Sequence, residues 1–328
     1  GISATNLDDV RAMPIIAGNI RLAATTAINV DKVTGTTVLG TRGDLNEQVG
    51  LSITANILAG TTINKNGLGA LQLGGASTSL TSIHVTNGSV VLGPSTNGGS
   101  NYPNAQVNLD SGTILDMRGA TNIQIGSVVG SGVIKNFSPA AAGTLVTGAD
   151  NVASTSFTGT LAADYTSGTL NVTKIGTGDW NLGADNASNI LGTLQINGGS
   201  ITLNSSTGRV GFVTTILGEG GTLNLDNSVD ALSNRLGGNT SVVSATADRT
   251  ISMRGGVLNY IGGASNVVEA TNTLTMLEGA SQWNLTASST NNTVFNIGTV
   301  SASSTTNRGS LVLNAGTGTL GGAAAGSN

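Results

Sequence analysis

The chain has 328 residues, a formal net charge of −4 and only 9% charged residues, against about 25% in typical soluble domains. Its 49 glycines are about twice the usual share, and it has 4 prolines and no cysteine. The lack of cysteine excludes disulfides, thiolate zinc sites and a cysteine nucleophile, and the lack of a basic excess argues against a nucleic-acid partner. Hydrophobic residues make up 38% and alternate with polar ones, so we expect a folded chain.

The start of the chain differs from the rest. Residues 1–45 contain Pro14 and the densest charges, and their best helical candidate, 5–13, is one or two turns at most. We expect residues 1–45 to form an irregular cap or assembly segment, and residues 46–328 to form one continuous β-structure. There is no initiator methionine, no signal-like start and no run of 18 apolar residues, so we expect a processed or partial chain that does not span a membrane.

Two stretches, residues 63–93 and 173–204, repeat one pattern. In each, apolar residues alternate with polar ones and are interrupted by glycines at matched places. Period-two alternation is typical of a strand with one buried face, and glycine supports turns with positive φ. We therefore expect strands at 70–73 and 179–182, each followed by a polar loop and two further strands around a glycine turn. The matched positions begin Lys65, Gly67, Gly69, Leu71 and Leu73 in one stretch and Lys174, Gly176, Gly178, Trp180 and Leu182 in the other, and later include Gly88 and Gly199.

The same pattern continues along the chain, with turn residues every 8–12 positions. We find no convincing amphipathic helix, so the prediction is an all-β protein. Strand–turn–strand units are predicted at 107–117, 221–227, 251–263, 274–285 and 309–320.

A repeating strand–turn unit without linkers favours a parallel β-helix, or β-solenoid, over a sandwich. With about 20–25 residues per coil, the chain would form about 13–16 coils at a spacing of roughly 4.8 Å, a single elongated rod on the order of 60–80 Å long. Val, Ile and Leu would stack inside the coils, and Thr, Ser and Asn would form polar ladders outside.

In residues 63–92 and 128–203 the chain resembles the autotransporter-associated β-strand repeat. The resemblance rests on the Lys-x-Gly-x-Gly-x-Leu-x-Leu-Gly pattern at 65–74 and 174–183, and weaker similarity extends over most of 50–320. Trp180 stands where the family usually has leucine. The resemblance implies a right-handed parallel β-helix in a secreted or surface-displayed bacterial protein, and it implies no particular activity.

A polysaccharide lyase or glycoside hydrolase is the main enzymatic alternative. Its site needs two or three carboxylates beside one sugar, often with Arg or Lys, so it should show a groove with at least two neighbouring carboxylates and a basic residue. We interpret the candidate carboxylates as exposed turn and strand-edge residues, and we predict no catalytic residue. The candidates are Asp8 with Asp9 and Arg11, Asp110 with Asp116 and Arg118, and Asp179 with Asp185.

The single histidine, His84, would have to carry any Ser-His-Asp triad. It lies between Ile83 and Val85 in a predicted strand, so its side chain should point outward into solvent. Lys65 and Lys174 are interpreted as solvated residues before a tight glycine turn, rather than as a basic ligand-binding ladder.

Aromatic residues are few and scattered. They could contact a sugar, but we expect them to fill the coils; they are Trp180, Trp283, Tyr165 and Tyr260. No EF-hand loop, calcium-binding nonapeptide or histidine tract is present, so we predict no metal and no cofactor.

The sequence thus predicts a non-enzymatic, extracellular or bacterial cell-surface β-solenoid, a structural or adhesive unit of a fibre or filament, as in a biofilm. Open strand edges at the end coils favour end-to-end association with further copies of the chain. Surface glycans are the other candidate partners. The alternatives are the polysaccharide-degrading β-helix and a phage or virion fibre, which should be an intertwined trimer.

Overall fold

A computed structural model describes residues 2–4, 14–32, 49–93, 100–121, 123–138, 141–163, 168–187, 189, 191–237, 249–288, 290–302 and 309–316. Within these residues the chain forms 30 strands and no helix, so the all-β prediction is confirmed. The chain divides into two compact units, Gly1–Asn151 with Thr158–Leu170 (unit 1) and Val152–Phe157 with Asn171–Asn328 (unit 2). The helical candidate at 5–13 and Tyr165 lie outside the described residues.

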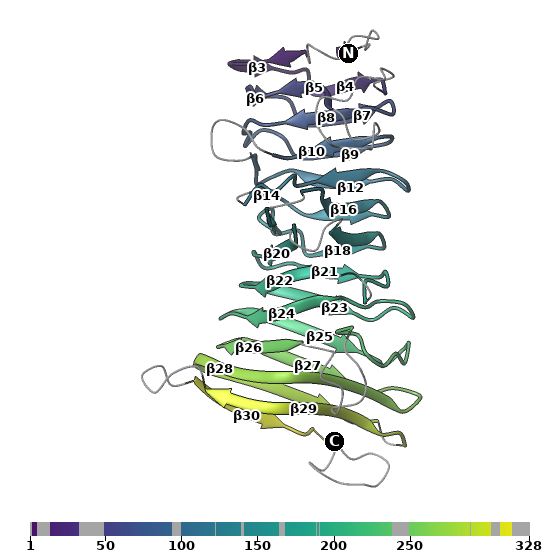
Figure 1. Ribbon diagram of the computed structural model, residues 1–328, viewed down its shortest axis with the longest axis vertical. Coiled ribbons are helices and arrows are strands. Elements are labelled where there is room, and N and C mark those ends of the chain that lie inside the picture. The colour runs from purple at the N-terminus through teal and green to yellow at the C-terminus, as the bar shows by residue number, and fades with distance from the viewer. Residues whose placement is uncertain are drawn as a thin grey trace. The chain divides into compact units, whose positions relative to one another are not determined.

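In unit 1 each turn of the chain contributes up to three strands to parallel ladders (Figure 1). The first ladder contains β1 (Ile2–Ala4), β4 (Thr25–Val30), β7 (Thr62–Asn66), β9 (Ser82–Val85), β12 (Gln106–Leu109) and β15 (Val128–Gly130). The second contains β2 (Ile15–Ile16), β5 (Val49–Ile53), β8 (Ala70–Leu73), β10 (Ser89–Val91), β13 (Ile114–Asp116), β16 (Val133–Asn136) and β19 (Thr160–Ala163). Shorter ladders join β3 (Asn19–Arg21) to β6 (Asn56–Ala59), and β11 (Asn101–Tyr102) to β14 (Ile123–Ile125) and β17 (Gly143–Thr147).

In unit 2 each turn contributes two strands to two parallel ladders. The first contains β18 (Ser154–Phe157), β21 (Asp179–Leu182), β23 (Gly199–Leu203), β25 (Gly221–Asp226), β27 (Val257–Ile261), the second half of β28 (Val267–Thr286) and β30 (Gly309–Asn314). The second contains β20 (Leu170–Lys174), β22 (Leu191–Ile196), β24 (Phe212–Leu217), β26 (Thr250–Arg254), the first half of β28 and β29 (Thr293–Ala302).

Two predicted strand–turn–strand units are instead single strands: 221–227 contains only β25, and 274–285 is part of β28. This strand pairs with β26 up to a register shift at Arg254 and then with β27 from Gln282 onward, so it changes ladders without ending. Gly279, with φ of +75°, lies between the two pairings.

The register gives the length of a coil. Ile63 lies opposite Ile83 and Ile83 opposite Val107, which are 20 and 24 residues further along the chain. Most other steps are similar, although Leu223 pairs with Leu258 across a longer connection. Parallel strands one coil apart are the defining feature of a solenoid, so the solenoid-like stacking is confirmed and the predicted coil length of about 20–25 residues holds for these steps.

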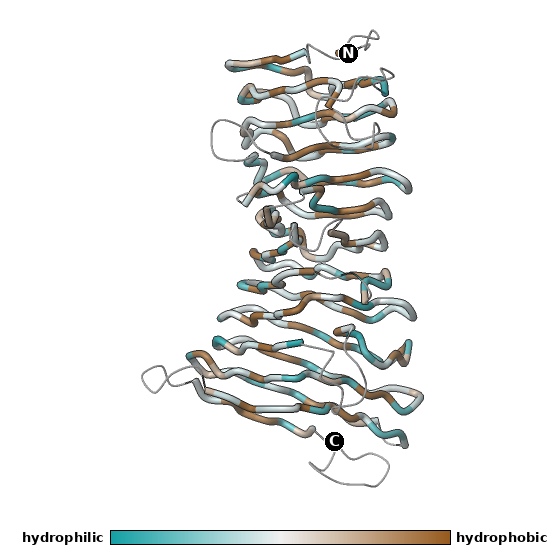
Figure 2. The backbone as a smooth tube through the Cα atoms, in the orientation of Figure 1, coloured by the Kyte–Doolittle hydropathy of each residue, from teal (hydrophilic) through white to brown (hydrophobic). Residues whose placement is uncertain are grey.

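The core consists of like residues stacked on like in successive coils. Figure 2 shows apolar and polar residues alternating along the strands, as a buried and an exposed face require. In the second ladder of unit 1 the buried stack is Leu71, Val90, Leu115, Ile134 and Leu161. Trp180, Trp283 and Tyr260 lie buried in unit 2, so the prediction that they fill the coils is confirmed.

Matched glycines in the two repeats lie where the backbones of two neighbouring coils approach closely. Gly88 has φ of +67°, and a Cβ there would lie 2.6 Å from the Gly69 carbonyl oxygen. Its counterpart Gly199 has φ of +60°, and a Cβ there would lie 2.2 Å from the oxygen of Gly178, the counterpart of Gly69. Only glycine fits such turns, because the backbone of the preceding coil passes where a side chain would begin.

Part of the predicted cap also forms strands. Within residues 14–32, β2 and β4 join the same ladders as β5 and β7. The remaining residues of the predicted cap, apart from 2–4, lie outside the described part of the chain.

Candidate functional site

The candidate carboxylates Asp110 and Asp116 serve different partners. Asp116 is buried, and it accepts hydrogen bonds from Arg118 Nε at 3.0 Å and from the backbone N–H of Phe137 at 3.0 Å. The interpretation of Asp116 as an exposed turn residue is therefore wrong. The fold can bury this carboxylate because it is paired with Arg118 and hydrogen-bonded to the backbone. Asp110 is partly exposed, and its Oδ1 lies 2.9 Å from His84 Nε2 one coil away.

His84 points outward as predicted, since Ile83 and Val85 on either side of it are buried. Its side chain is 34% exposed, so it is not fully solvated, because Asp110 of the next coil covers its Nε2. The pair links two neighbouring strands of the first ladder, β9 and β12.

Asp179 and Asp185 likewise bind the following coil. Asp179 Oδ1 accepts hydrogen bonds from Ser200 Oγ at 2.6 Å and from Thr202 Oγ1 at 2.8 Å. Asp185 Oδ2 lies 2.9 Å from Arg209 Nη1, in an ion pair 24 residues apart in sequence. The third group, Asp8 with Asp9 and Arg11, lies outside the described residues.

A ladder of asparagines runs from Asp179 along the outer face of unit 2. Each member donates a side-chain hydrogen bond to the member one coil earlier, over distances of 2.7–3.0 Å. The members after Asp179 are Thr202, Asn224, Asn259, Asn284 and Asn314. The predicted polar ladders outside the coils are thus present in unit 2.

This asparagine ladder has a direction. Every donor points toward Asp179, whose carboxylate can only accept, so the chain of bonds begins at an anion. An ionised acceptor strengthens the first bond, and a polarised chain strengthens those that follow.

Two lysines, predicted to be solvated, are buried. Lys65 has no exposed surface, and its Nζ donates to the backbone oxygens of Asn66 at 3.0 Å, Gly67 at 2.7 Å and Asn87 at 3.0 Å. Lys174, its repeat counterpart, is 3% exposed and donates to the oxygens of Ile175 and Gly198. The prediction of solvated lysines is therefore wrong, because each ammonium finds carbonyl acceptors in its own turn and in the turn of the next coil.

Burial lowers the pKa of Lys65 to about 8, because an ammonium loses its hydration inside the protein. At neutral pH it is still charged, with three N–H donors for three carbonyl acceptors. The lysine therefore acts as a cross-link between turns and not as a ligand-binding ladder.

Arg235 and Glu269 form a second buried charged cluster, in unit 2. Arg235 is fully buried and donates through Nε to Asn227 Oδ1 at 2.8 Å and through Nη1 to the oxygen of Ser205 at 2.9 Å. Glu269 is also fully buried, and its Oε2 accepts the backbone N–H of Arg235 at 2.7 Å. The cluster joins two loops, which contain Ser205 and Arg235, to strand β28, which contains Glu269.

Burial raises the pKa of Glu269 to about 7, although backbone N–H groups and the charge of Arg235 oppose the shift. A raised carboxyl pKa is common at catalytic sites, but the partners of Glu269 here are structural.

A charged hollow in unit 2 has the composition expected of a glycan-cleaving site. It encloses about 280 Å³ and is lined by Glu219, Arg254 and Glu278 together with Gly255, Gly279 and Ala280. Arg254 Nε lies 3.0 Å from Glu278 Oε1, and both side chains are about half exposed. No local sequence pattern reveals this group, because Glu219 and Arg254 are 35 residues apart and meet only through the stacking of coils.

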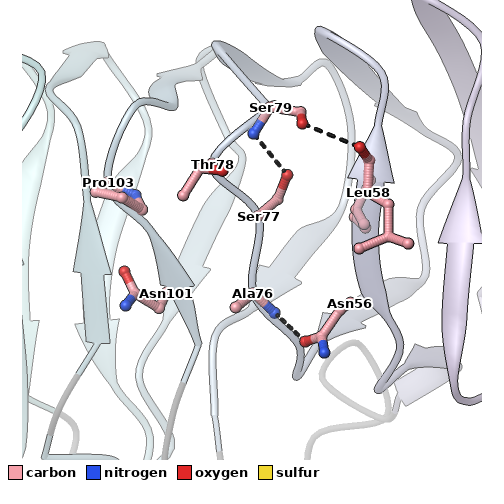
Figure 3. A pocket seen from close by; sticks show the side chains of 9 residues that line it. Asn56, Leu58, Ala76, Ser77, Thr78, Ser79, Asn101 and Pro103 are labelled. Atoms are coloured by element: carbon pink, nitrogen blue, oxygen red, sulfur yellow. Dashed lines mark hydrogen bonds between the residues drawn. The ribbon is translucent and has the colours of Figure 1, made fainter.

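A neutral hollow lies in unit 1, where three consecutive turns of the chain pass side by side (Figure 3). It encloses about 310 Å³. Its lining residues are Asn56, Ile57, Leu58, Ala76, Ser77, Thr78, Ser79, Asn101 and Pro103. No charged side chain is among these described residues, so the two hollows differ in the ligands that they could accept.

Within the described part of the chain, no group of three or more His, Asp or Glu side chains could hold a metal ion. Nor do the described residues contain a helix of the length and hydrophobicity needed to cross a membrane.

Comparison of the chain with family models, with curated proteins and with solved structures finds no match. The resemblance to the autotransporter-associated repeat therefore stays a prediction, and the function has to be argued from the geometry.

Proposed function

We propose that this protein is a right-handed parallel β-helix that forms a single elongated rod and serves as a non-catalytic structural or adhesive unit outside the cell or at its surface. The asparagine ladder is the observation that carries the proposal. Polar side chains on this face bind the next coil rather than a substrate. Side-chain hydrogen bonds between successive coils stabilise a stiff scaffold.

End-to-end association of copies is part of the proposal, and the last described strands support it. β29 and β30 pair with β28, and within the described residues no strand pairs with their other edges. Val300 is 63% exposed there, and Val312 and Leu313 are each 49% exposed. An open edge with exposed apolar side chains favours addition of another β-coil, and a second copy can supply one.

Negative-stain electron microscopy and sedimentation across protein concentrations test the assembly. We expect filaments or concentration-dependent oligomers for the native chain, and their loss in Val300→Asp and Leu313→Asp. Val229→Asp is the matched control, because Val229 is 82% exposed in unit 2 but outside these strands. Isolated particles at every concentration would refute the assembly.

A polysaccharide-degrading enzyme is the second candidate, and the charged hollow is the observation that favours it. Two glutamates and an arginine are the side chains that a glycan-cleaving site needs. A cleavage screen over uronic-acid and neutral polysaccharides tests this candidate, with Glu219→Gln and Glu278→Gln as variants. Cleavage that both variants abolish would replace the scaffold proposal with an enzymatic one.

A further inference from the structure

The neutral hollow of unit 1 is a shallow site with walls from separate turns. Asn101 and Pro103 lie on one side and Asn56 and Leu58 on the other, with the segment 76–79 between them (Figure 3). The walls come from three successive passes of the chain, so they are held at the spacing of the coils, about 4.8 Å per step.

Polar side chains of this hollow have hydrogen-bonding capacity to spare. Within the described residues, no hydrogen bond engages the amide of Asn101 or the hydroxyl of Thr78, and both residues are exposed. Asn56 uses its Oδ1 to accept the N–H of Ala76 at 3.2 Å, which leaves its amide nitrogen as a donor. The hollow therefore offers donors and acceptors of the amide and hydroxyl type to a ligand.

Elsewhere in unit 1, corresponding side chains on neighbouring coils are paired with one another. Examples are Ser52 Oγ with Gln72 Oε1 at 3.0 Å, Thr86 Oγ1 with Asn66 Oδ1 at 2.7 Å and Gln106 Nε2 with Ser127 Oγ at 3.0 Å. At the hollow this side-chain pairing is interrupted, and the groups face solvent instead.

The backbone around the hollow is nevertheless fixed. Ser77 Oγ accepts the N–H groups of Ser79 and Leu80, and Ser79 Oγ donates to the oxygen of Leu58 at 3.2 Å. Asn104 Nδ2 donates to the oxygen of Thr78 at 2.8 Å. A site held in this way binds with little loss of conformational freedom.

Apolar surface lies beside the polar groups. Leu58 is 48% exposed, and Pro103 adds a second apolar wall. A ligand that fits must combine hydroxyl groups with an apolar face, and a lining without charge gives no preference to an ionic one. A hollow of about 310 Å³ is at the small end of the range for ligand sites, about 300–1,000 Å³.

We infer that this hollow binds a sugar residue of a neutral polysaccharide, with Asn101 and Thr78 bonding its hydroxyl groups and Leu58 covering its apolar face. The inference deepens the adhesive part of the proposed function and rests on it, but it does not require end-to-end assembly.

Calorimetric titration of the full chain with neutral glucan, mannan and galactan oligosaccharides tests the inference, with oligogalacturonate as the charged comparator. We expect binding of at least one neutral oligosaccharide and weaker binding of the charged one. Asn101→Ala and Thr78→Val should each weaken that binding about tenfold or more, because they remove a hydroxyl partner and no hydrogen bond of the fold. Asn87→Ala is the matched control: Asn87 is an exposed asparagine of unit 1 outside the hollow, and its variant should bind as the native chain does.

No binding of any neutral oligosaccharide would overturn the inference, and so would equal binding by the native chain and the Asn101 and Thr78 variants. Sedimentation of the same samples separates this result from the assembly proposal. Native protein that binds sugar but stays monomeric would support the sugar site and refute end-to-end assembly. Filaments formed by protein that binds no sugar would support assembly and refute the sugar site.

Discussion

A single buried side chain, Lys65, joins two turns of unit 1. It bonds the carbonyls of Asn66 and Gly67 in its own turn and that of Asn87 in the next coil. Lys174 repeats the arrangement in unit 2 with Ile175 and Gly198. The lysine and the glycine turn are therefore one structural feature, because the turn places carbonyls where the ammonium can reach them.

Lys65→Ala should lower the free energy of unfolding by roughly 3 kcal/mol, because three partly buried carbonyls lose their donor and a fully buried unsatisfied group costs about 1–3 kcal/mol. Urea denaturation measures the change. Lys32→Ala, at an exposed lysine of the same unit, should stay within about 0.5 kcal/mol of the native chain. Equal effects of the two substitutions would show that Lys65 is not a cross-link.

Glu269 should make the stability of unit 2 depend on pH. Burial raises its folded pKa from the ordinary value of 4.5 to about 7, so between these pH values the native state holds a proton that the unfolded state has lost. The contribution is fully present below pH 4.5 and is lost as pH rises through about 7.

The comparison with Glu269→Gln isolates this effect, because glutamine can accept the Arg235 N–H without titrating. Denaturation midpoints measured from pH 4 to pH 8 should show the native chain losing stability relative to the variant as pH rises. A constant difference between the two proteins would mean that Glu269 titrates alike in the folded and unfolded states.

For individual residues, the sequence predicted the direction of some side chains but not their partners. The outward direction of His84 followed from the alternation around it, but its partner Asp110 did not, because the pair forms across the coil spacing. The same alternation places Lys65 on the face of the buried Ile63, so its inward direction was available from the sequence. Its acceptor in the next coil, the Asn87 carbonyl, was not, because it lies 22 residues away.

The asparagine ladder is the element that distinguishes unit 2. Thr202, Asn224, Asn259, Asn284 and Asn314 lie opposite one another in the register of β23, β25, β27, β28 and β30. A side-chain hydrogen bond from each of these strands to the one before it adds to the backbone ladder.

Asn259→Asp should destabilise unit 2 by about 1–3 kcal/mol, because the carboxylate cannot donate to Asn224 Oδ1 and places two acceptors face to face. Thermal or urea unfolding checks this. Asn87→Asp makes the same chemical change at an exposed position in unit 1 and should have little effect. A small effect at Asn259 would mean that water replaces the ladder bond at no cost.

Element boundaries followed from the pattern where the turns are short. The strands expected at 70–73 and 179–182 are β8 and β21 with those bounds, and the unit at 107–117 contains β12 and β13. The prediction of two strands and a turn at 274–285 was wrong. In β28 the chain continues as one strand through Gly279, because pairing with β26 before it and with β27 after it keeps the backbone extended.

At the scale of the whole molecule, the stability of each coil depends on the coils that it packs against. In a solenoid each coil contacts only the coils beside it, so a destabilising substitution should affect mainly the neighbouring coils.

Gly88→Ala should increase amide hydrogen exchange most in β8, β10 and β13 and progressively less in coils further away, because its Cβ would collide with the Gly69 oxygen. Gly112→Ala is the control, since Gly112 also has positive φ, of +80°, but nothing lies within 4 Å of its Cβ. Uniform exchange over all strands of unit 1 would contradict a nearest-neighbour fold.

The sequence alone determined the all-β class and the alternation that separates core from surface, because these depend on neighbours within a few residues. Tertiary structure alone decided which polar side chains meet. Lys65 with Asn87, Asp110 with His84, and the linings of the two hollows join residues about 20 or more positions apart. The register of successive coils brings these residues together, and local sequence patterns do not fix that register where connections vary in length, as between Leu223 and Leu258.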